Sequence, residues 1–332
     1  MSDHPSIPAP AIGVLLTNLG TPDAAEAGAV RRYLAEFLVD RRVVELPPIL
    51  WKPILHAVIL RTRPKKTARA YAQIWTGEGS PLAAITRAQS VALQDAFGPD
   101  VIVDYAMRYG RPAISDRLAA LKAQGCERIL IAPLYPQYCA ATTATANDAA
   151  FAALAGMRWQ PALRTLPPYY DDPAYIDALA QSVRTNVAAL DFVPDALVAS
   201  FHGMPVRTLE LGDPYHCHCV KTARLLGEAL EQELVLCFQS RFGKAKWLEP
   251  ATDTTLAALP ARGVKRVAIV APGFSADCVE TLEEIAIRGR KTFLAAGGTH
   301  FASLACLNAS PPGITMLKTL VSRQLEGWIS YP

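Results

Sequence analysis

The sequence lacks a long apolar run. An export signal would place a basic region before its apolar stretch, but residues 1–10 contain no Lys or Arg and the apolar stretch 11–16 is short. A membrane-spanning helix needs about 20 mostly apolar residues. The segment that comes nearest, 49–60, is interrupted by Lys52, Pro53 and His56. We therefore expect a chain without a cleavable signal and without a membrane span.

The sequence also lacks a dominant charge and a disulfide framework. The 33 Lys and Arg nearly balance the 30 Asp and Glu, which leaves a formal charge of +3. A nucleic-acid-binding domain would need a concentrated basic face, so we expect no nucleic-acid partner. The seven cysteines are odd in number and irregularly spaced. This excludes a complete set of disulfides and favours reduced thiols in the cytoplasm.

What the sequence does have is an alternation of strand and helix patterns. Hydrophobic residues make up 51% of its 332 residues, and at roughly 150 residues per domain this length predicts two domains. Short β-branched runs alternate with stretches of helical period, which predicts an α/β fold with parallel sheets. The expected strands are 12–18, 101–106, 129–133, 196–201, 234–238 and 267–271, and the expected helices are 82–96, 113–124, 174–190, 222–233 and 282–295.

The two halves of the chain resemble each other. Segments 14–22 and 197–205 both read as a strand followed by Gly-x-Pro, and 129–133 is echoed by 267–272. This repetition predicts two similar α/β domains, 10–170 and 171–332, which meet near 167–173 around a cleft, with the last helix packing back on the first domain. Ligands of open parallel sheets lie beyond the carboxyl ends of the strands, so we expect the chemistry there.

A histidine and a pair of acids follow two of the expected strands. His202 comes directly after strand 196–201, where an imidazole can accept a proton or bind a metal, although it could equally be satisfied by a neighbouring carbonyl. Asp277 and Glu280 follow strand 267–271 and share one face of a helical turn. Acids at this place also favour a helix start by capping it. Together with His202 they would form a proton-accepting or metal-binding set.

Two other segments each allow a functional and a structural interpretation. His216, Cys217, His218 and Cys219 are consecutive potential ligands, but their spacing is not that of a usual zinc site, and buried structural thiols are the competing interpretation. The segment 47–66 joins an apolar part to Arg61, Arg63, Lys65 and Lys66. That composition suits a lip over a pocket or a contact with anionic lipid, and also suits an ordinary buried helix with a solvated end.

Eight segments together resemble the ferrochelatase family, whose members insert ferrous iron into a porphyrin. They occur in family order at 16–22, 79–82, 107–110, 134–138, 200–203, 212–215, 239–248 and 277–282. The resemblance implies two Rossmann-like domains with parallel sheets flanked by helices, a chelatase-like fold with porphyrin in the cleft. It implies catalytic roles for His202, Glu280 and Asp277, with His202 and Glu280 also meeting the iron. It further implies substrate contacts for Arg41, as a propionate ligand, and for Ser80, Arg108, Tyr109, Tyr138 and Trp247.

Two departures from the family pattern involve cysteine. Cys278 stands where many relatives have His, so no second histidine is expected there. Some relatives hold a [2Fe–2S] cluster on one cysteine near the Tyr-Pro-Gln-Tyr segment and three near the chain end. Cys139 fits the first place, but only Cys306 follows Cys278, so that pattern is not reproduced. We therefore expect no required cofactor, and the alternative is a [2Fe–2S] cluster on Cys139, Cys217, Cys219 and Cys237.

The resemblance implies the last step of haem biosynthesis, a lyase reaction that yields protohaem from protoporphyrin IX and releases two protons. The apolar segment 49–60 and the Asp277–Cys278 pair favour protoporphyrin over coproporphyrin. A coproporphyrin ferrochelatase, a cobalt or nickel chelatase of another tetrapyrrole, and a carrier without chemistry stay open. The expected partners are porphyrin, ferrous iron and, through segment 47–66, the surface of the inner membrane. The oligomeric state is open.

Overall fold

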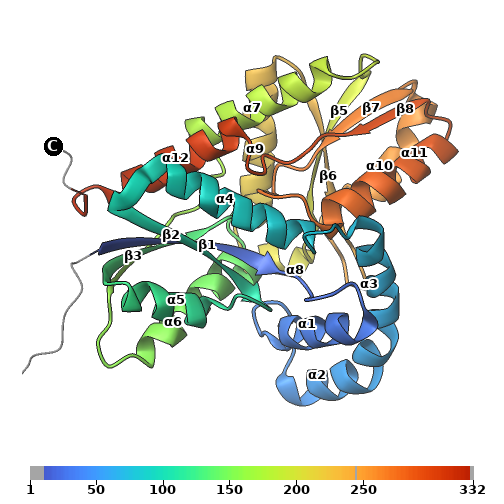
Figure 1. Ribbon diagram of the computed structural model, residues 1–332. Helices are drawn as coiled ribbons and strands as arrows, with labels where there is room; N and C mark the ends of the chain where they lie inside the picture. The colour runs from blue at the N-terminus through green and yellow to red at the C-terminus, as the bar shows by residue number, and fades with distance from the viewer. Residues whose placement is uncertain (1–10, 244, 330–332) are drawn as a thin grey trace, which may run out of the picture.

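Two four-stranded parallel sheets form the framework of the protein (Figure 1). The computed structural model describes residues 11–243 and 245–329. The first sheet has the order β2-β1-β3-β4, and the second has the order β6-β5-β7-β8. Their strands are β1 (Ala11–Gly20), β2 (Val101–Tyr109), β3 (Cys126–Pro133), β4 (Ala162–Thr165), β5 (Ala196–His202), β6 (Leu234–Gln239), β7 (Arg266–Val270) and β8 (His300–Ser303).

The identical strand order confirms the α/β fold class and the similarity of the two halves. β1 and β5 take the same place, each paired in parallel with two neighbours. All six expected strands are present. The two outer strands, β4 and β8, were not expected, because four residues at a sheet edge are too few to show a period.

Helices fill the connections between the strands. In chain order they are α1 (Ala27–Val39), α2 (Pro48–Ile54), η1 (Leu55–Ile59), α3 (Leu60–Ile74), α4 (Pro81–Phe97), η2 (Gly98–Asp100), α5 (Ile114–Ala123), η3 (Ala140–Ala144), α6 (Thr145–Ala155), α7 (Pro173–Ala188), α8 (Val206–Glu210), α9 (Tyr215–Leu230), α10 (Thr252–Ala258), η4 (Leu259–Arg262), η5 (Glu280–Gly289), α11 (Arg290–Ala295) and α12 (Pro311–Leu325). Of these, η1, η3 and η5 are π-helices.

The expected helix 222–233 differs from the structure at its start. Helix α9 begins at Tyr215, because the Asp213 carboxylate accepts a hydrogen bond from the Tyr215 N–H (3.0 Å) and Pro214 precedes the first turn. The segment 216–219 is therefore helical. Since successive helical residues point about 100° apart, its four potential ligands cannot converge on one ion.

A single apolar cluster connects the two sheets. It includes Val14 and Leu130 from the first sheet, Leu197 and Ala268 from the second, and Leu320 of α12. Helix α4 lies between the sheets in Figure 1, and α12 contacts both α4 and α7. The carboxyl edges of the two sheets are thus held in a fixed relation by buried side chains.

Helices α1 to α3 form a smaller body beside the second domain (Figure 1). They enclose a cluster that contains Tyr33, Leu55 and Tyr71, and Val279 and Leu282 at the start of η5 pack against it. Segment 47–66 is helical as α2, η1 and the beginning of α3. Among the described residues, no helix is long and apolar enough to cross a membrane.

Candidate active site

His202 ends strand β5, and the structure determines which of its ring nitrogens is free. Nδ1 lies 2.7 Å from the Gly203 carbonyl oxygen. A carbonyl oxygen only accepts hydrogen bonds, so Nδ1 carries the proton and the neutral ring has its lone pair on Nε2. The carbonyl contact anticipated as the structural alternative is therefore present. It also prepares the other nitrogen to accept a proton or to bind a metal.

Glu280 begins helix η5 close to the same sheet edge. The Gln239 side chain donates to the Glu280 backbone oxygen (3.1 Å), and Gln239 is the register partner of His202. The start of η5 is therefore tied to the end of β5 through one residue of β6. His202 and the first residue of η5 therefore belong to the same carboxyl edge of one sheet and are joined through Gln239.

The start of η5 lies against tyrosines of the first domain, because Val279 and Leu282, on either side of Glu280, pack on the cluster that contains Tyr33 and Tyr71. Burial raises the pKa of Tyr71, and the negative charge of Glu280 raises it further. Burial, Tyr71 and Glu280, in that order, raise the pKa of Tyr33. Tyr33 also lines a polar pocket of about 460 Å³, together with Arg32 and Glu36. The Glu280 carboxyl group thus lies where the two domains meet.

Asp277 has a different environment from Glu280. Only 8% of it is exposed, and its carboxylate accepts hydrogen bonds from the Thr281 hydroxyl (2.8 Å) and the Asn308 amide (2.7 Å). The Asn308 side-chain oxygen in turn accepts from the Asp277 N–H (2.8 Å). These contacts fix the turn before η5. The capping interpretation is wrong, because Val279 is the N-cap residue of η5 and the Asp277 carboxylate accepts, among the described residues, only from side chains.

Sequence reasoning did not single out Glu284, which lies one turn beyond Glu280. Its carboxylate accepts from the Ser240 N–H (2.8 Å) and the Ser240 hydroxyl (2.6 Å), and Arg288 lies 3.6 Å away. The spacing of four between Glu280 and Glu284 was the available signal. An acidic ridge on η5 therefore runs along the end of β6.

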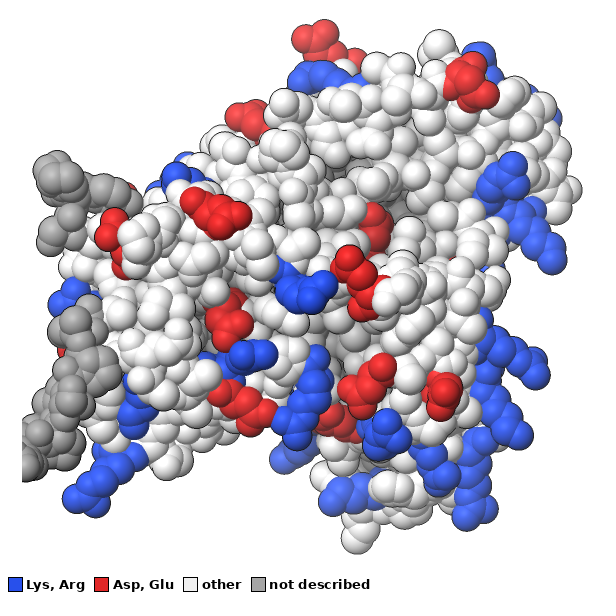
Figure 2. Space-filling view, viewed as in Figure 1, with Lys and Arg blue, Asp and Glu red and all other residues white. Residues whose placement is uncertain are grey.

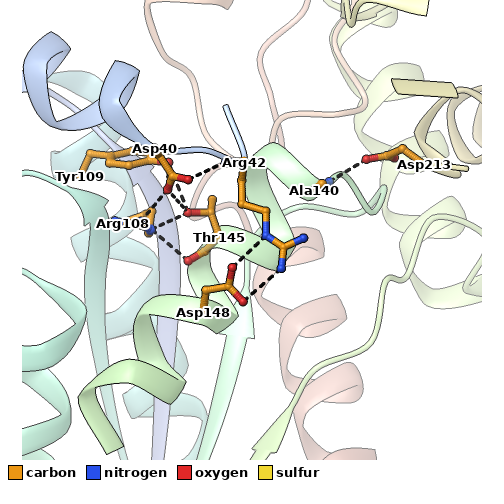
Figure 3. Close-up of polar contacts among 8 residues, drawn as sticks. All are labelled: Asp40, Arg42, Arg108, Tyr109, Ala140, Thr145, Asp148 and Asp213. Atoms are coloured by element: carbon orange, nitrogen blue, oxygen red, sulfur yellow. Dashed lines mark hydrogen bonds and ion pairs between the residues drawn. The ribbon is translucent and has the colours of Figure 1, made fainter. Parts of the chain in front are cut away.

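Arg108 and Tyr109 belong to a polar cluster centred on Asp40 (Figure 3). Arg108 donates to Asp40 (2.6 Å) and to Thr145 (2.7 and 2.9 Å), and the Tyr109 hydroxyl donates to Asp40 (2.9 Å). Thr145 also donates to Asp40 (2.5 Å). Tyr109 is fully buried, so its contribution is to hold the Asp40 carboxylate in place.

Arg41 and Arg42 are neighbours with different partners. Arg42 pairs with Asp148 on α6 (2.8 Å), as Figure 3 shows. Arg41 is exposed and lines a pocket of about 200 Å³ with Val44, Leu46 and Trp51, among others. A guanidinium beside an apolar hollow suits a flat ligand that carries a carboxylate.

The remaining substrate candidates lie on three separate segments. Ser80 is buried and accepts from Thr21 (2.8 Å). The Tyr138 N–H donates to His218 Nδ1 (3.2 Å). Trp247 donates to the Phe242 carbonyl (2.8 Å). The Phe242 ring in turn lies under the guanidinium of Arg63 at 4.4 Å, so this loop of the second domain reaches α3.

The four cysteines considered for an iron–sulfur cluster do not share one environment. Cys139 and Cys219 lie in the core cluster that joins the two sheets, Cys237 lies in a different cluster of the second domain, and Cys217 is exposed. Burial raises the pKa of Cys139, Cys219 and Cys237, which disfavours the thiolate that iron would need. In 11–243 and 245–329, no three His, Cys, Asp or Glu side chains are grouped to hold a metal ion. These residues do not fit a [2Fe–2S] cluster.

Comparisons with known proteins identify the family of the chain. The family model described as Ferrochelatase matches residues 11–325. The chain is 53% identical to a ferrochelatase of Rhizobium meliloti over 335 residues, covering 99% of both chains. It is 52% identical to a ferrochelatase of Agrobacterium fabrum (99% of this chain, 97% of the relative) and 50% identical to one of Methylocella silvestris (96% and 95%).

Solved structures show the same fold at low identity. SirB from Bacillus subtilis with Fe³⁺ matches with a TM-score of 0.57 at 14% identity, covering 97% of this chain and all of that one. The sirohydrochlorin chelatase SirB of subspecies spizizenii in complex with cobalt matches with a TM-score of 0.55 at 12% identity, covering 96% of each chain. With the family model matched over nearly the whole length and relatives at about half identity, the chain belongs to the ferrochelatase family.

Proposed function

We propose that this protein inserts ferrous iron into protoporphyrin IX, giving protohaem and two protons. Family membership supports a porphyrin metal chelatase. The observation that supports the site is that His202 and Glu280 are tied to one sheet edge, with the His202 Nε2 lone pair free and Glu280 facing the first domain. A lyase of this kind has to remove two pyrrole protons while a metal ion approaches the ring.

His202 and Glu280 take the two chemical roles in this proposal. Nε2 of His202 accepts a pyrrole proton or ligates the incoming iron, because Nδ1 is already committed to the Gly203 carbonyl. Glu280 conducts protons or metal from the side of Tyr33 and Tyr71. Asp277 acts behind it and holds the start of η5 through Thr281 and Asn308.

Groups of the first domain bind the macrocycle in this proposal. Arg41 contacts a propionate at the pocket beside Trp51. The Asp40 carboxylate fixes the side chains of Arg108 and Tyr109. Ser80, Tyr138 and Trp247 line the remaining wall. Binding energy gained on these walls can bend the ring so that its nitrogen lone pairs become accessible. The chain's own residues supply this chemistry, and no resident cofactor is required.

Two features support protoporphyrin over coproporphyrin. Arg108 and Arg42 are paired with Asp40 and Asp148, and the pocket beside Trp51 is lined by two cations, Arg41 and Lys52. Two cations match the two propionates of protoporphyrin rather than the four of coproporphyrin. The lip of α2 and η1 presents exposed Ile49, Leu50 and others, which suits a ring with apolar vinyl groups. Anaerobic assays with ferrous iron and each porphyrin, followed by haem absorbance, should give the higher kcat/KM for protoporphyrin.

The same lip supports a peripheral contact of a cytoplasmic protein with the inner membrane. Ile49 is 82% exposed and Leu50 is 61% exposed. Figure 2 shows Lys and Arg gathered along the edge of the molecule over α2 and α3, where Lys52, Arg61, Lys65 and Lys66 occur. Apolar side chains beside a basic edge favour the surface of anionic lipid.

The decisive test replaces the imidazole. His202→Ala should abolish iron insertion while porphyrin binding, seen as a shift of the Soret band, is retained. His300→Ala, which removes an exposed histidine at the start of strand β8, is the control and should keep full activity. A His202→Ala variant with normal turnover would refute the proposed site, and porphyrin binding without turnover by the unmodified protein would favour a carrier.

A further inference from the structure

Gln239 is buried at the point where the His202 and Glu280 segments meet. It ends strand β6, pairs in register with His202 and is 3% exposed. Its side-chain oxygen accepts from the Ser200 hydroxyl (2.7 Å), and its side-chain nitrogen donates to the Glu280 carbonyl (3.1 Å). One amide therefore bridges β5 and the first residue of η5.

The backbone of Gln239 holds the other side of His202. Its carbonyl oxygen accepts from the Gly203 N–H (2.7 Å). A Cβ atom on Gly203 would lie 2.5 Å from that oxygen, well inside van der Waals contact, so the approach requires glycine. Gln239 thus contacts the residues on both sides of the histidine, Ser200 two positions before it and Gly203 directly after it.

Ser240, the residue after Gln239, is also bonded to η5. Ser240 has φ +67°, a left-handed conformation that non-glycine residues adopt at a cost. The Glu284 carboxylate holds it there by accepting from both the Ser240 N–H and its hydroxyl (2.8 and 2.6 Å). Gln239 at the end of β6 and Ser240 directly after it are therefore bonded to η5, Gln239 to Glu280 and Ser240 to Glu284.

We propose that Gln239 is a positioning residue that sets the distance between the His202 imidazole and the Glu280 carboxyl group. This inference rests on the proposed function of those two residues. The amide bridge and the Ser240–Glu284 contact hold η5 against the end of β5. A displacement of about 1 Å between reacting groups can reduce the rate by roughly 100-fold, so loss of the bridge should lower turnover more than substrate binding.

Gln239→Leu removes both side-chain contacts at similar volume, and Gln94→Leu provides a matched control. Gln94 also bonds through both ends of its amide, donating to Gly98 (2.7 Å) and Val101 (2.9 Å) and accepting from Val103 (2.8 Å), but it is half-buried and lies in the first domain. Both variants should lose thermal stability. Only Gln239→Leu should lower kcat for iron insertion, by about 10- to 100-fold, with KM and Soret-detected porphyrin affinity within about twofold of the unmodified protein.

Gln239→Glu isolates the bridge to η5. The ionised side chain still accepts from Ser200 but cannot donate to the Glu280 carbonyl, so its kcat should fall as in Gln239→Leu. The inference is overturned if both Gln239 variants turn over normally while His202→Ala is inactive. It is also overturned if Gln94→Leu loses kcat equally. Normal turnover by His202→Ala would instead show that the proposed function is at fault.

Discussion

Arg108 donates to Asp40 at 2.6 Å, and the two side chains are only 20% and 10% exposed. Burial by itself would raise the pKa of Asp40. The hydrogen bonds from Thr145, the Arg42 N–H and Tyr109, together with the charge of Arg108, outweigh it and hold this pKa below its usual value. The Asp40 carboxylate is therefore the ionised centre to which Arg108, Tyr109 and Thr145 are bonded.

Replacing Asp40 by Asn should destabilise the protein at neutral pH by about 3 kcal/mol, because it leaves a buried guanidinium without its partner. The lowered pKa means that this stability is present above the unfolded-state pKa near 4 and is lost as pH falls through the folded-state value. The difference between the two proteins in urea unfolding should thus shrink below about pH 4.

The exposed pair Arg111 and Asp116 provides the comparison for this measurement. Asp116→Asn should change stability by about 1 kcal/mol or less, since exposed ion pairs contribute little. An equal loss in the Asp40 and Asp116 variants would contradict the assignment of Asp40 as the centre of the cluster.

Gly203→Ala should destabilise the second domain by about 1–3 kcal/mol, because its methyl group would meet the Gln239 carbonyl oxygen. Gly28→Ala in α1 is the matched control. A Cβ there has no neighbour within 4 Å, and alanine favours a helix. Thermal unfolding should therefore move down for the first variant and up slightly for the second. Equal shifts of the melting temperature in the two variants would show that the Gln239 backbone moves to accommodate the added methyl group.

Thiol labelling should separate one cysteine from six. Cys217 is exposed, and the other six cysteines are buried. Burial also raises the pKa of Cys126 and of Cys237 to about 11, which lowers their reactivity. An aromatic disulfide reagent should titrate one thiol rapidly in the native protein and seven after denaturation. Cys217→Ser should remove the rapid phase, and acid-labile sulfide should be absent after anaerobic purification.

Ile49→Glu with Leu50→Glu should weaken binding to vesicles that contain anionic lipid, because both side chains lie exposed on the lip. Val193→Glu is the control, because it places a negative charge on an apolar residue of the second domain with similar exposure (72%). Co-sedimentation with vesicles measures the difference. Equal binding by the two proteins would show that the lip does not face the lipid.

Much of the fold could be predicted because strand and helix periods are local properties. The six expected strands and the repetition of segment 14–22 in 197–205 were sufficient to predict two similar domains. Strands β4 and β8 are too short to show a period. Helix α9 begins before the apolar spacing that predicted it, because its first residue, Tyr215, follows Pro214 and donates to the Asp213 carboxylate.

Site geometry was less accessible from the sequence, because it depends on contacts between distant residues. The position of His202 and the start of η5 at one sheet edge follows from strand order, and so it could be expected. The burial of Tyr109 and the Asp40 cluster depend on where α1 and α6 pack, which no local pattern records. The consecutive ligands at 216–219 were separated by helical geometry alone.

The apolar cluster that joins the two sheets has a thermodynamic consequence. Val14 and Leu130 pack in the same apolar cluster as Leu197 and Ala268. Unfolding of one half would therefore expose much of the other half's buried apolar surface to water. Melting one half would therefore remove support from the other, and calorimetry should record one cooperative transition. A fragment that ends near residue 170 would expose this surface and aggregate.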